Sequence, residues 1–410
     1  YASYLQMKAD DRSSYDYVVQ GDPSWTSLSR EHPCYHCHEY ESDVWAALFN
    51  AKMWYITGDS LHAEKAIEIL NTWSNLTNFF GGDGADREIF YGQGTEPLSA
   101  GIFGAPLINA AEIIKSTYDG WDKADIDKFK AMLVHPGYSN TTVPTEDIAK
   151  DNVTFYWRCY MFDPARHGNQ EMAPARTLMA IGIFLDNEII YDRALRYVKG
   201  LPHRSDDLPY EPGPRIPTSI KSQSEYSISY NYKVETSIED YGYEGVITNY
   251  IYENGQCQES SRDQTHSLMG IAFACEMAEM AWNQGDNLYA WANNRLLLGL
   301  EYTLRYNLSI ERSYPDQLEP WEPSEPDDFY QKQTRSACWK ALKIRPSARG
   351  NRTIRRPALE MPLNHYLMRM NIPEDRLKWL WRSRDYSIEK NGLEECGWNL
   401  QNPGWGGLTY

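Results

Sequence analysis

The sequence lacks the features of a membrane-spanning protein and of a general nucleic-acid binder. No stretch approaches the ~20 consecutive apolar residues that a transmembrane helix needs, because polar residues interrupt even the most apolar segments, 178–185 and 271–280. Basic residues are also in the minority: 40 Lys and Arg against 57 Asp and Glu give a formal net charge of −17. We therefore expect a soluble globular protein without a nucleic-acid or membrane partner.

An initiator Met and an apolar signal segment are absent from the start of the chain, which begins at Tyr1. Such a start is typical of a processed secretory protein or of a trimmed chain. Five sequons for N-linked glycans, where composition alone would give about two or three, also favour a secreted, extracellular protein. Their asparagines are Asn75, Asn140, Asn152, Asn307 and Asn351.

The chain also lacks a second cluster of metal ligands. His32, Cys34, His36, Cys37 and His38 lie within seven residues, and imidazole with thiolate is the ligand chemistry of zinc. A structural zinc site needs a second ligand pair at a suitable spacing, which the sequence does not offer. The cluster therefore favours a disulfide-bonded loop or the lip of a polar cavity over a metal site.

Aromatic residues and helical periodicity are what the sequence has in abundance. The 14 Trp and 30 Tyr suit the stacking of sugar-like ligands as well as ordinary packing. Apolar residues recur at helical spacing in five consecutive pairs of segments, and connections as short as Asp186-Asn187 predict antiparallel helices. Such pairs stack as a curved solenoid or close into a toroid. The pairs are 42–57 with 60–74, 107–117 with 125–134, 172–185 with 188–198, 262–282 with 286–306, and 358–370 with 373–381.

The segment 205–252 departs from this pattern. Ser224–Lys233 alternates as a β-strand does, and Pro and Gly punctuate the residues before it. We predict a single domain over 1–410 with a β-rich insertion or lid at about 205–252.

Three predicted helices begin with polar residues. Glu259, Arg262, Asp263 and His266 share one helical face ahead of an apolar run. The segments 166–171 and 360–366 show the same order of polar residues and apolar helix. Paired structural groups are the alternative at each start, because buried charges are normally paired. In a toroid, however, these starts would converge on one polar pocket.

Four blocks of the sequence carry a family resemblance. They are the first helix pair, Asn109-Ala-Ala-Glu112, His167-Gly-Asn-Gln170 and Gln258-Glu-Ser-Ser-Arg-Asp-Gln-Thr-His266. Together they resemble the alginate-lyase and glucuronan-lyase group of polysaccharide lyases. The resemblance implies a mainly α fold, an α/α toroid built as an incomplete or closed barrel of antiparallel helix pairs. It also implies cleavage of a 1,4-linked polyuronate, glucuronan or alginate, by metal-independent β-elimination that leaves 4,5-unsaturated ends.

This reaction removes a proton α to a carboxylate, so amide and guanidinium donors must stabilise the charge that develops. By resemblance, Asn169 matches the neutralising Asn and Arg262 the Arg of the later helix. Gln170 stands where several relatives place His, and Leu268-Met269 where some carry Tyr. No metal or organic cofactor is required.

The proton-transfer residue stays open at this point. Tyr252 could lie over the helix start at Arg262, and Tyr366 could be polarised by His365. His266 and His167 are the alternative bases. The further residues expected to contact substrate are Gln170, Glu259, Asn364, His365, Arg345 and Arg349.

Two other functions compete with the lyase. A toroid glycoside hydrolase would use a carboxylate pair such as Glu259 with Asp263 or Glu360, although Arg262 one turn from Glu259 argues against a general acid there. A non-catalytic glycan-binding protein would use aromatic clefts alone. For the lyase, the strip 332–356, with nine Lys and Arg and no acid, is expected to border the cleft and capture the polyanion.

Overall fold

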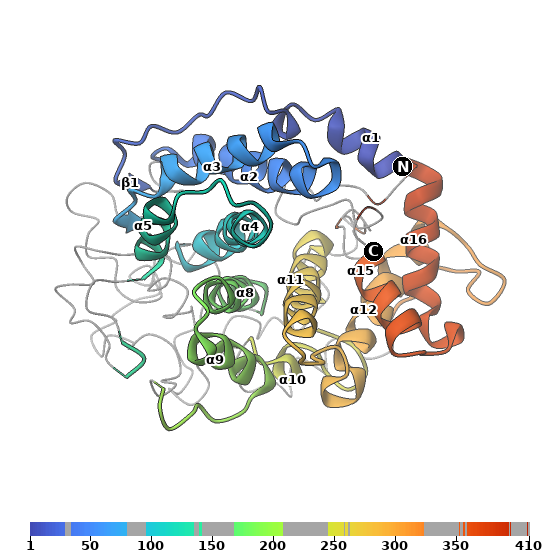
Figure 1. Cartoon of the computed structure of the whole chain (residues 1–410). Helices are drawn as coiled ribbons and strands as arrows, with labels where there is room; N and C mark the ends of the chain where they lie inside the picture. Colours follow the sequence, from blue (N-terminus) through green and yellow to red (C-terminus); the bar gives the residue numbers. More distant parts are fainter. Residues whose placement is uncertain are drawn as a thin grey trace.

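The computed structural model describes residues 1–28, 34–79, 96–134, 139–141, 168–207, 245–257, 259–260, 263–323, 352, 356, 359–392, 394 and 408. Helices make up most of them, as Figure 1 shows. Two short strands, β1 (Ser27–Leu28) and β2 (Asn78–Phe79), pair in parallel. The prediction of a mainly α fold is confirmed.

The helices are, in chain order, α1 (Ala2–Lys8), η1 (Asp11–Ser13), α2 (Cys37–Thr57), α3 (Ser60–Trp73), α4 (Glu96–Thr117), α5 (Lys123–Leu133), α8 (Gly168–Phe184), α9 (Glu188–Lys199), α10 (Ile247–Tyr250), α11 (Gln264–Asn283), α12 (Trp291–Glu311), α15 (Glu360–Asn364), η6 (His365–Arg369), η7 (Glu374–Leu377) and α16 (Lys378–Asn391). All five predicted pairs are present: α2 with α3, α4 with α5, α8 with α9, α11 with α12, and α15 and η6 with α16.

Local signals set the turns within the pairs. Gly58 ends α2 with φ of 71°, a left-handed conformation that glycine adopts without steric cost. Asp59 then caps α3, because its side chain accepts a hydrogen bond from the Leu61 N–H at 3.1 Å. Asn187 caps α9 in the same way, accepting from the N–H groups of Ile189 and Ile190. These caps explain why the sequence placed these two turns correctly.

In the pairs α2 with α3 and α11 with α12, hydrogen bonds show that the two helices run antiparallel. His62, early in α3, lies 2.8 Å from Asn50, late in α2, whereas Trp73 at the end of α3 donates to Asp43 near the start of α2. Similarly, Tyr289 before α12 donates to the Cys275 carbonyl in the second half of α11.

The first helices of successive pairs run parallel and form an inner layer. In α4 and α8, the Ala105 N–H donates to the Thr177 hydroxyl, and ten residues farther along α4 the Lys115 ammonium donates to the Phe184 carbonyl. The order of contacts along both helices is the same, which makes them parallel. Every residue of α8 except Ile183 is buried, as expected for an inner helix.

The same direction continues on both sides of α4 and α8. Between α2 and α4, Tyr40 contacts Phe103 and Trp54 contacts Thr117. Between α11 and the last inner helix, the Arg356 guanidinium contacts Thr265 at the start of α11, and Arg369 of η6 pairs with Glu279 near its end. The inner layer is therefore α2, α4, α8, α11 and α15 with η6. With α3, α5, α9, α12 and α16 as the outer helices, it forms a mainly α toroid (Figure 1).

A buried arginine joins three inner helices. Arg176 of α8 pairs through Nη1 with Glu276 of α11, and through Nη2 donates to the Gly101 and Ile102 carbonyls of α4 at 2.9 and 2.8 Å. Gly101 is required at this crossing, because a Cβ there would overlap the backbone of Ala173. Close packing and charge pairing thus fix how the inner helices stack.

Several helix boundaries differ from the prediction; α16, for example, spans Lys378–Asn391 where 373–381 was expected. α4 begins at Glu96 and runs through Pro106, earlier than the predicted start at 107. The φ values of Ala292 to Asn294 lie between 50° and 61°, so the regular part of α12 starts only after them. The predicted helix 358–370 is divided into α15 and the π-helical turn η6.

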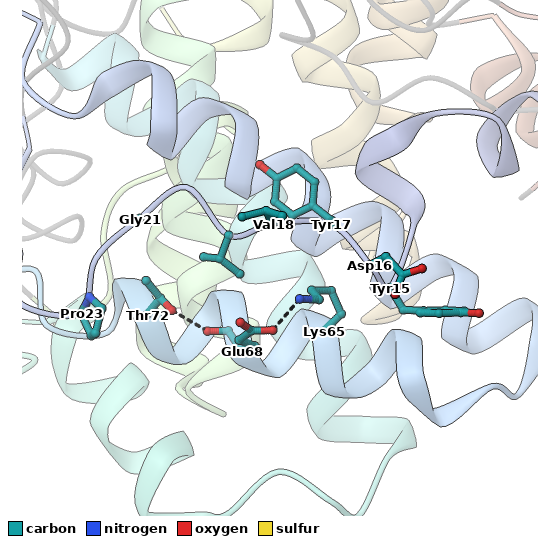
Figure 2. A pocket seen from close by; sticks show the side chains of 10 residues that line it. Tyr15, Asp16, Tyr17, Val18, Gly21, Pro23, Lys65, Glu68 and Thr72 are labelled. Atoms are coloured by element: carbon teal, nitrogen blue, oxygen red, sulfur yellow. Dashed lines mark hydrogen bonds and ion pairs between the residues drawn. The ribbon is translucent and has the colours of Figure 1, made fainter.

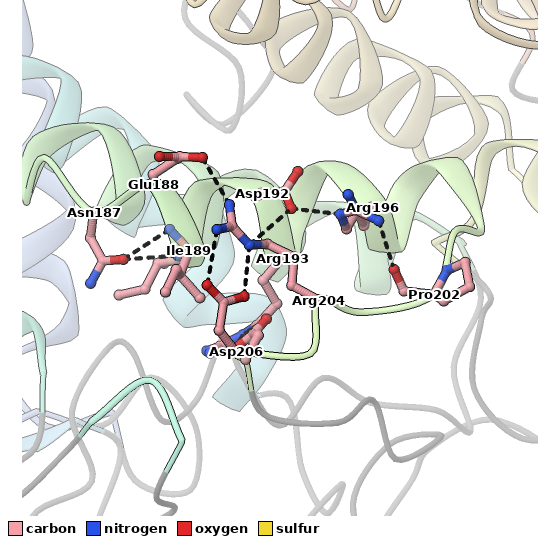
Figure 3. Close-up of polar contacts among 11 residues, drawn as sticks. Asn187, Glu188, Ile189, Asp192, Arg193, Arg196, Pro202, Arg204 and Asp206 are labelled. Atoms are coloured by element: carbon pink, nitrogen blue, oxygen red, sulfur yellow. Dashed lines mark hydrogen bonds and ion pairs between the residues drawn. The ribbon is translucent and has the colours of Figure 1, made fainter.

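The predicted β-rich insertion at 205–252 falls mostly on 208–244, outside the described residues. Its described end contains the short helix α10, and Ile251 forms an isolated bridge with Cys257. Before it, an ion-pair network fixes 201–207 to α9, with Arg204 reaching Glu188 and Asp206 (Figure 3). None of the described helices is long and apolar enough to cross a membrane.

Candidate functional site

The candidate site lies where the inner helices begin. Because these helices run parallel, the N-terminal ends of α2, α4, α8, α11 and α15 lie at one end of the toroid. All three polar helix starts singled out in the sequence are among them. The structure therefore brings those segments to one end, as the toroid hypothesis required.

A buried hydrogen-bonded group joins the start of α8 to the residues before α11. Glu259 is fully buried, and its carboxylate accepts from the Asn169 backbone N–H at 3.1 Å and from Asn169 Nδ2. The Tyr250 hydroxyl donates to the same carboxylate at 3.2 Å. Ser267 completes the group by donating to the Glu259 carbonyl at 2.6 Å. A carboxylate held by several donors fixes the relative position of two helix starts.

This geometry changes the role expected of Asn169. The residue is buried, and its Nδ2 is directed at Glu259 rather than at solvent. In the described structure its amide is thus not available to stabilise charge on a substrate. Asn169 instead fits a structural link between α8 and α11, and Gln170 beside it is buried as well.

Buried thiol and phenol groups surround Glu259. Burial, followed by the nearby Glu259 charge, raises the pKa of Cys257 to about 12. Burial also raises the pKa of Tyr250 well above its usual value, and Cys257 and Glu259 add to this. Both groups therefore stay protonated at neutral pH and act as donors rather than as bases.

His266 and Asp263 form a partly exposed pair at the start of α11. The His266 Nδ1 atom lies 2.6 Å from Asp263 Oδ1, and the side chains are 32% and 26% exposed. A carboxylate only accepts hydrogen bonds, so Nδ1 carries a proton, and in the neutral form of the ring Nε2 keeps its lone pair. Among the described residues, none forms a hydrogen bond with Nε2. This is the arrangement of a histidine that a carboxylate orients for proton transfer.

The cap of α11 holds this pair in place. Asp263 Oδ1 also accepts from the His266 backbone N–H at 3.2 Å and from the Thr265 hydroxyl at 2.6 Å. Beneath it, the buried Arg356 guanidinium donates through Nε to the Thr265 carbonyl at 3.2 Å. Burial lowers the pKa of Arg356 to about 10, with Asp263 partly opposing the change, so Arg356 remains charged at neutral pH.

The tyrosines proposed for proton transfer are buried. Tyr252 is 3% exposed, and Tyr366 is fully buried with its hydroxyl donating to the Tyr289 carbonyl at 3.1 Å. The proposed polarisation of Tyr366 by His365 is wrong, because the two rings meet edge to face with centres 6.0 Å apart. A polymer on the surface would not reach either hydroxyl in this structure.

The remaining members of the third helix start contact other residues of the protein. His365 is buried, stacks on Tyr289 with ring centres 3.9 Å apart, and accepts through Nδ1 from Arg369 at 3.2 Å. Glu360 is buried and accepts from Arg384 Nε at 2.9 Å, while Asn364 donates to the Glu360 carbonyl. These contacts hold His365 and Asn364 within the protein, while His365 Nε2 is buried without a hydrogen-bond partner among the described residues. Substrate binding by His365 and Asn364 stays a prediction.

Several predicted residues lie outside the described part of the chain: His167, Arg262, Arg345 and Arg349. Within the basic strip 332–356, Arg352 and Arg356 are described, and both are buried. Arg352 lies 3.6 Å from the Tyr306 ring centre and pairs with Glu322. These two arginines therefore contact the protein itself and are not part of an exposed basic surface.

The cysteine and histidine cluster contains a disulfide between Cys34 and Cys37. The disulfide-bonded loop that the sequence favoured over zinc is present at the start of α2. Its sulfurs are bonded to each other, so neither is a thiolate ligand in this state.

The glycan sequons differ in accessibility. Asn75 and Asn140 are partly exposed, whereas Asn307 is buried and donates to the Gln264 side chain at 2.9 Å. A glycan on Asn307 does not fit the folded protein. Asn152 and Asn351 lie outside the described residues.

A shallow hollow of about 660 Å³ lies elsewhere, between residues 15–23 and the outer helix α3 (Figure 2). Lys65 and Glu68 on its floor are paired with each other at 2.6 Å. Asp43 holds the wall in place, because it accepts from the Gln20 and Gly21 backbone N–H groups at 3.0 and 2.9 Å. The hollow lies along an outer helix and contains none of the predicted site residues.

Sequence reasoning missed Tyr250 and the orienting role of Asp263. Tyr250 is an unremarkable aromatic in the sequence, and only its buried contact with Glu259 distinguishes it. Asp263 could have been recognised from its spacing, because a helix cap and the residue three positions later lie side by side.

Known proteins resemble this chain in structure rather than in sequence. No family model matches the chain, and no curated protein matches its sequence. Among solved structures, an alginate lyase from Bacteroides ovatus is similar, with a TM-score of 0.46, 11% sequence identity, and coverage of 85% of this chain and 91% of that one.

Proposed function

We propose that this protein is a polysaccharide lyase that cleaves an acidic polysaccharide by β-elimination. The substrate is a 1,4-linked polyuronate such as glucuronan or alginate, and His266 is the base. The observation that carries the proposal is the His266–Asp263 pair, which offers Nε2 at the end of the toroid where the inner helices begin. The family resemblance of residues 258–266 supports the same assignment.

The chemistry follows from the orientation of the ring. Asp263 holds the proton on Nδ1, so Nε2 accepts the proton from C5 of the uronate. The electrons of the C5–H bond form the C4–C5 double bond as the C4–O4 bond breaks, and the leaving oxygen takes up a proton from solvent water. Arg262, directly before Asp263 in the sequence, is the proposed partner of the substrate carboxylate.

A pair of catalytic carboxylates is less well supported. Glu259 is fully buried and engaged by Asn169 and Tyr250, and Glu360 is buried and paired with Arg384. Asp263 is committed to His266. A glycoside hydrolase needs one protonated and one free carboxylate on opposite sides of the bond, which these contacts do not favour.

The test is incubation with a panel of polyuronates while following the ultraviolet absorbance of the conjugated double bond. We expect an unsaturated product that survives chelator, and His266→Gln should reduce kcat by about 100-fold or more. His203→Gln is the matched control, because His203 is an exposed histidine on the 201–207 loop. Its activity should equal that of the wild type.

Asp263→Asn separates orientation from capping, since Asn still accepts the hydrogen bonds that start the helix. It should lower kcat with little change in KM and shift the pH profile of kcat. New reducing ends without the chromophore would establish hydrolysis and refute the lyase. Full activity of the His266 variant would refute the assignment of the base alone.

An extracellular location is part of this proposal. The disulfide between Cys34 and Cys37 supports it, because such bonds persist mainly in oxidising compartments. Detection with an antibody in the growth medium, and not in the cell fraction, is the expected result.

A further inference from the structure

The segment from Cys34 to His38 gathers three metal-ligand atoms at the start of α2. The sulfurs of Cys34 and Cys37 and a ring nitrogen of His38 all lie within 4.8 Å of one another. Cys34 and His38 are exposed, whereas Cys37 is buried. The candidate base His266 plays no part in this cluster, so the proposed lyase reaction does not account for it.

Contacts independent of the disulfide hold this loop in its shape. His36 has φ of 58°, a left-handed conformation that turns the chain into α2. Trp25 stacks on the His36 ring with centres 3.5 Å apart and a 12° angle between the planes. The His36 carbonyl then accepts the first helical hydrogen bond from the Tyr40 N–H at 3.0 Å. We expect the two sulfurs to stay close when their bond is broken.

We propose that, once the disulfide is reduced, Cys34, Cys37 and His38 form a binding site for Zn²⁺ or a similar thiophilic divalent cation. Two thiolates and an imidazole are the ligands that zinc prefers, and a Cys-x-x-Cys spacing places both sulfurs on one ion. The soft sulfurs select against Ca²⁺ and Mg²⁺.

The step balances with a water-soluble phosphine as reductant. The phosphine attacks one sulfur and the S–S bond breaks. Water then supplies the oxygen of the phosphine oxide and the two protons of the thiols. Exposure of Cys34 gives the reductant access to a sulfur. Zn²⁺ then displaces both thiol protons, while His38 donates the lone pair of its ring nitrogen.

The proposed site has three protein ligands. His36 is not a fourth, because its ring is stacked against Trp25. The exposure of Cys34 and His38 leaves the remaining position open to water. Cys37 is the first residue of α2, where the helix end favours the thiolate form.

In the experiment, the full chain is reduced with the phosphine. The phosphine is then removed under oxygen-free conditions, and the reduced protein is titrated with Co²⁺. We expect one Co²⁺ per chain, with sulfur-to-cobalt charge-transfer absorption and tetrahedral ligand-field bands, and its displacement by one equivalent of Zn²⁺. The oxidised protein should show neither band. Circular dichroism should show that the helices persist after reduction.

Two variants and a control make the assignment specific. Cys34→Ser should weaken binding by at least about 100-fold, and His38→Ala by about 10-fold or more. Cys275→Ser is the control, since Cys275 is a buried free thiol outside the cluster and its loss should change nothing. The inference is overturned if the reduced wild type does not bind Co²⁺, if it unfolds on reduction, or if either cluster variant binds as the wild type does.

Discussion

Buried His365 should make the protein sensitive to acid. Burial, and then the neighbouring Arg369 charge, lower the pKa of His365 from 6.5 to about 4 in the folded protein. The unfolded chain therefore binds a proton between these two pH values while the folded protein does not. By linkage, stability is fully present above pH 6.5 and is lost as the pH falls toward 4.

The size of the effect follows from the two pKa values. One pKa unit corresponds to about 1.4 kcal/mol, so His365 should reduce the free energy of unfolding by about 3 kcal/mol between pH 7 and pH 4. The contacts explain why the charged form is disfavoured: Nδ1 accepts from Arg369, and the ring stacks on Tyr289. A proton on Nδ1 would break the first contact and place two positive charges together.

The perturbation is His365→Gln, which keeps an acceptor but does not titrate. Urea unfolding followed by Trp fluorescence should be measured for both proteins at several pH values between 4 and 7.5. The variant should be less stable at pH 7, because stacking is lost. The difference from wild type should shrink by about 3 kcal/mol as the pH falls to 4.

Glu301 is the reason for comparing the free energies of unfolding of wild type and His365→Gln, rather than following the pH dependence of the wild type alone. Burial raises the pKa of Glu301 to about 7, although it accepts from the Trp379 and Leu380 N–H groups, so its contribution to stability is lost as the pH rises. Glu301→Gln should therefore alter the pH dependence in the opposite direction. A wild-type-minus-His365→Gln difference that stays constant across the pH range would refute the linkage argument.

Two further predictions concern the inner layer of helices. Arg176→Met should cost about 3–5 kcal/mol in urea unfolding, because it removes the cation paired with Glu276 and the donor to the Gly101 and Ile102 carbonyls of α4. A loss below about 1 kcal/mol would show that the inner helices do not depend on this pair. Gly101→Ala should cost about 3 kcal/mol because its Cβ overlaps the Ala173 backbone, whereas Gly58→Ala, with φ of 71° and nothing within 4 Å, should cost only about 1 kcal/mol. Equal losses for the two glycines would contradict the close crossing of α4 and α8.

Much of the fold could be predicted because its signals are local. The Gly58-Asp59 turn and the Asn187 cap act within a few residues, so they fix helix ends in any sequence context. The short connections predict antiparallel pairs, which either stack as a solenoid or close into a toroid, and the structure decides for the toroid (Figure 1). The split of 358–370 into α15 and η6 could not be foreseen, since the apolar spacing of this segment fits one continuous helix.

The sequence predicted the candidate site only in part. The sequence identified Asp263 and His266 as neighbours on one helical face, and the structure makes them a hydrogen-bonded pair. It could not separate His266 from Tyr252 and Tyr366 as proton-transfer residues, because side-chain type says nothing about burial. The single domain over 1–410 and the capture of substrate by Arg345 and Arg349 stay predictions.

The sequence by itself thus determined the helix pairs, their turns and the polar character of the inner helix starts, because each depends on residues within one or two turns of one another. Only the tertiary structure decided which polar groups face solvent. Asn169 and Glu259 stand 90 positions apart, and their contact exists because α8 and α11 pack in parallel. This packing buries the Asn169 amide, whereas His266 stays partly exposed. Burial is a property of all the elements around a residue, so it cannot be read from the residue's own segment.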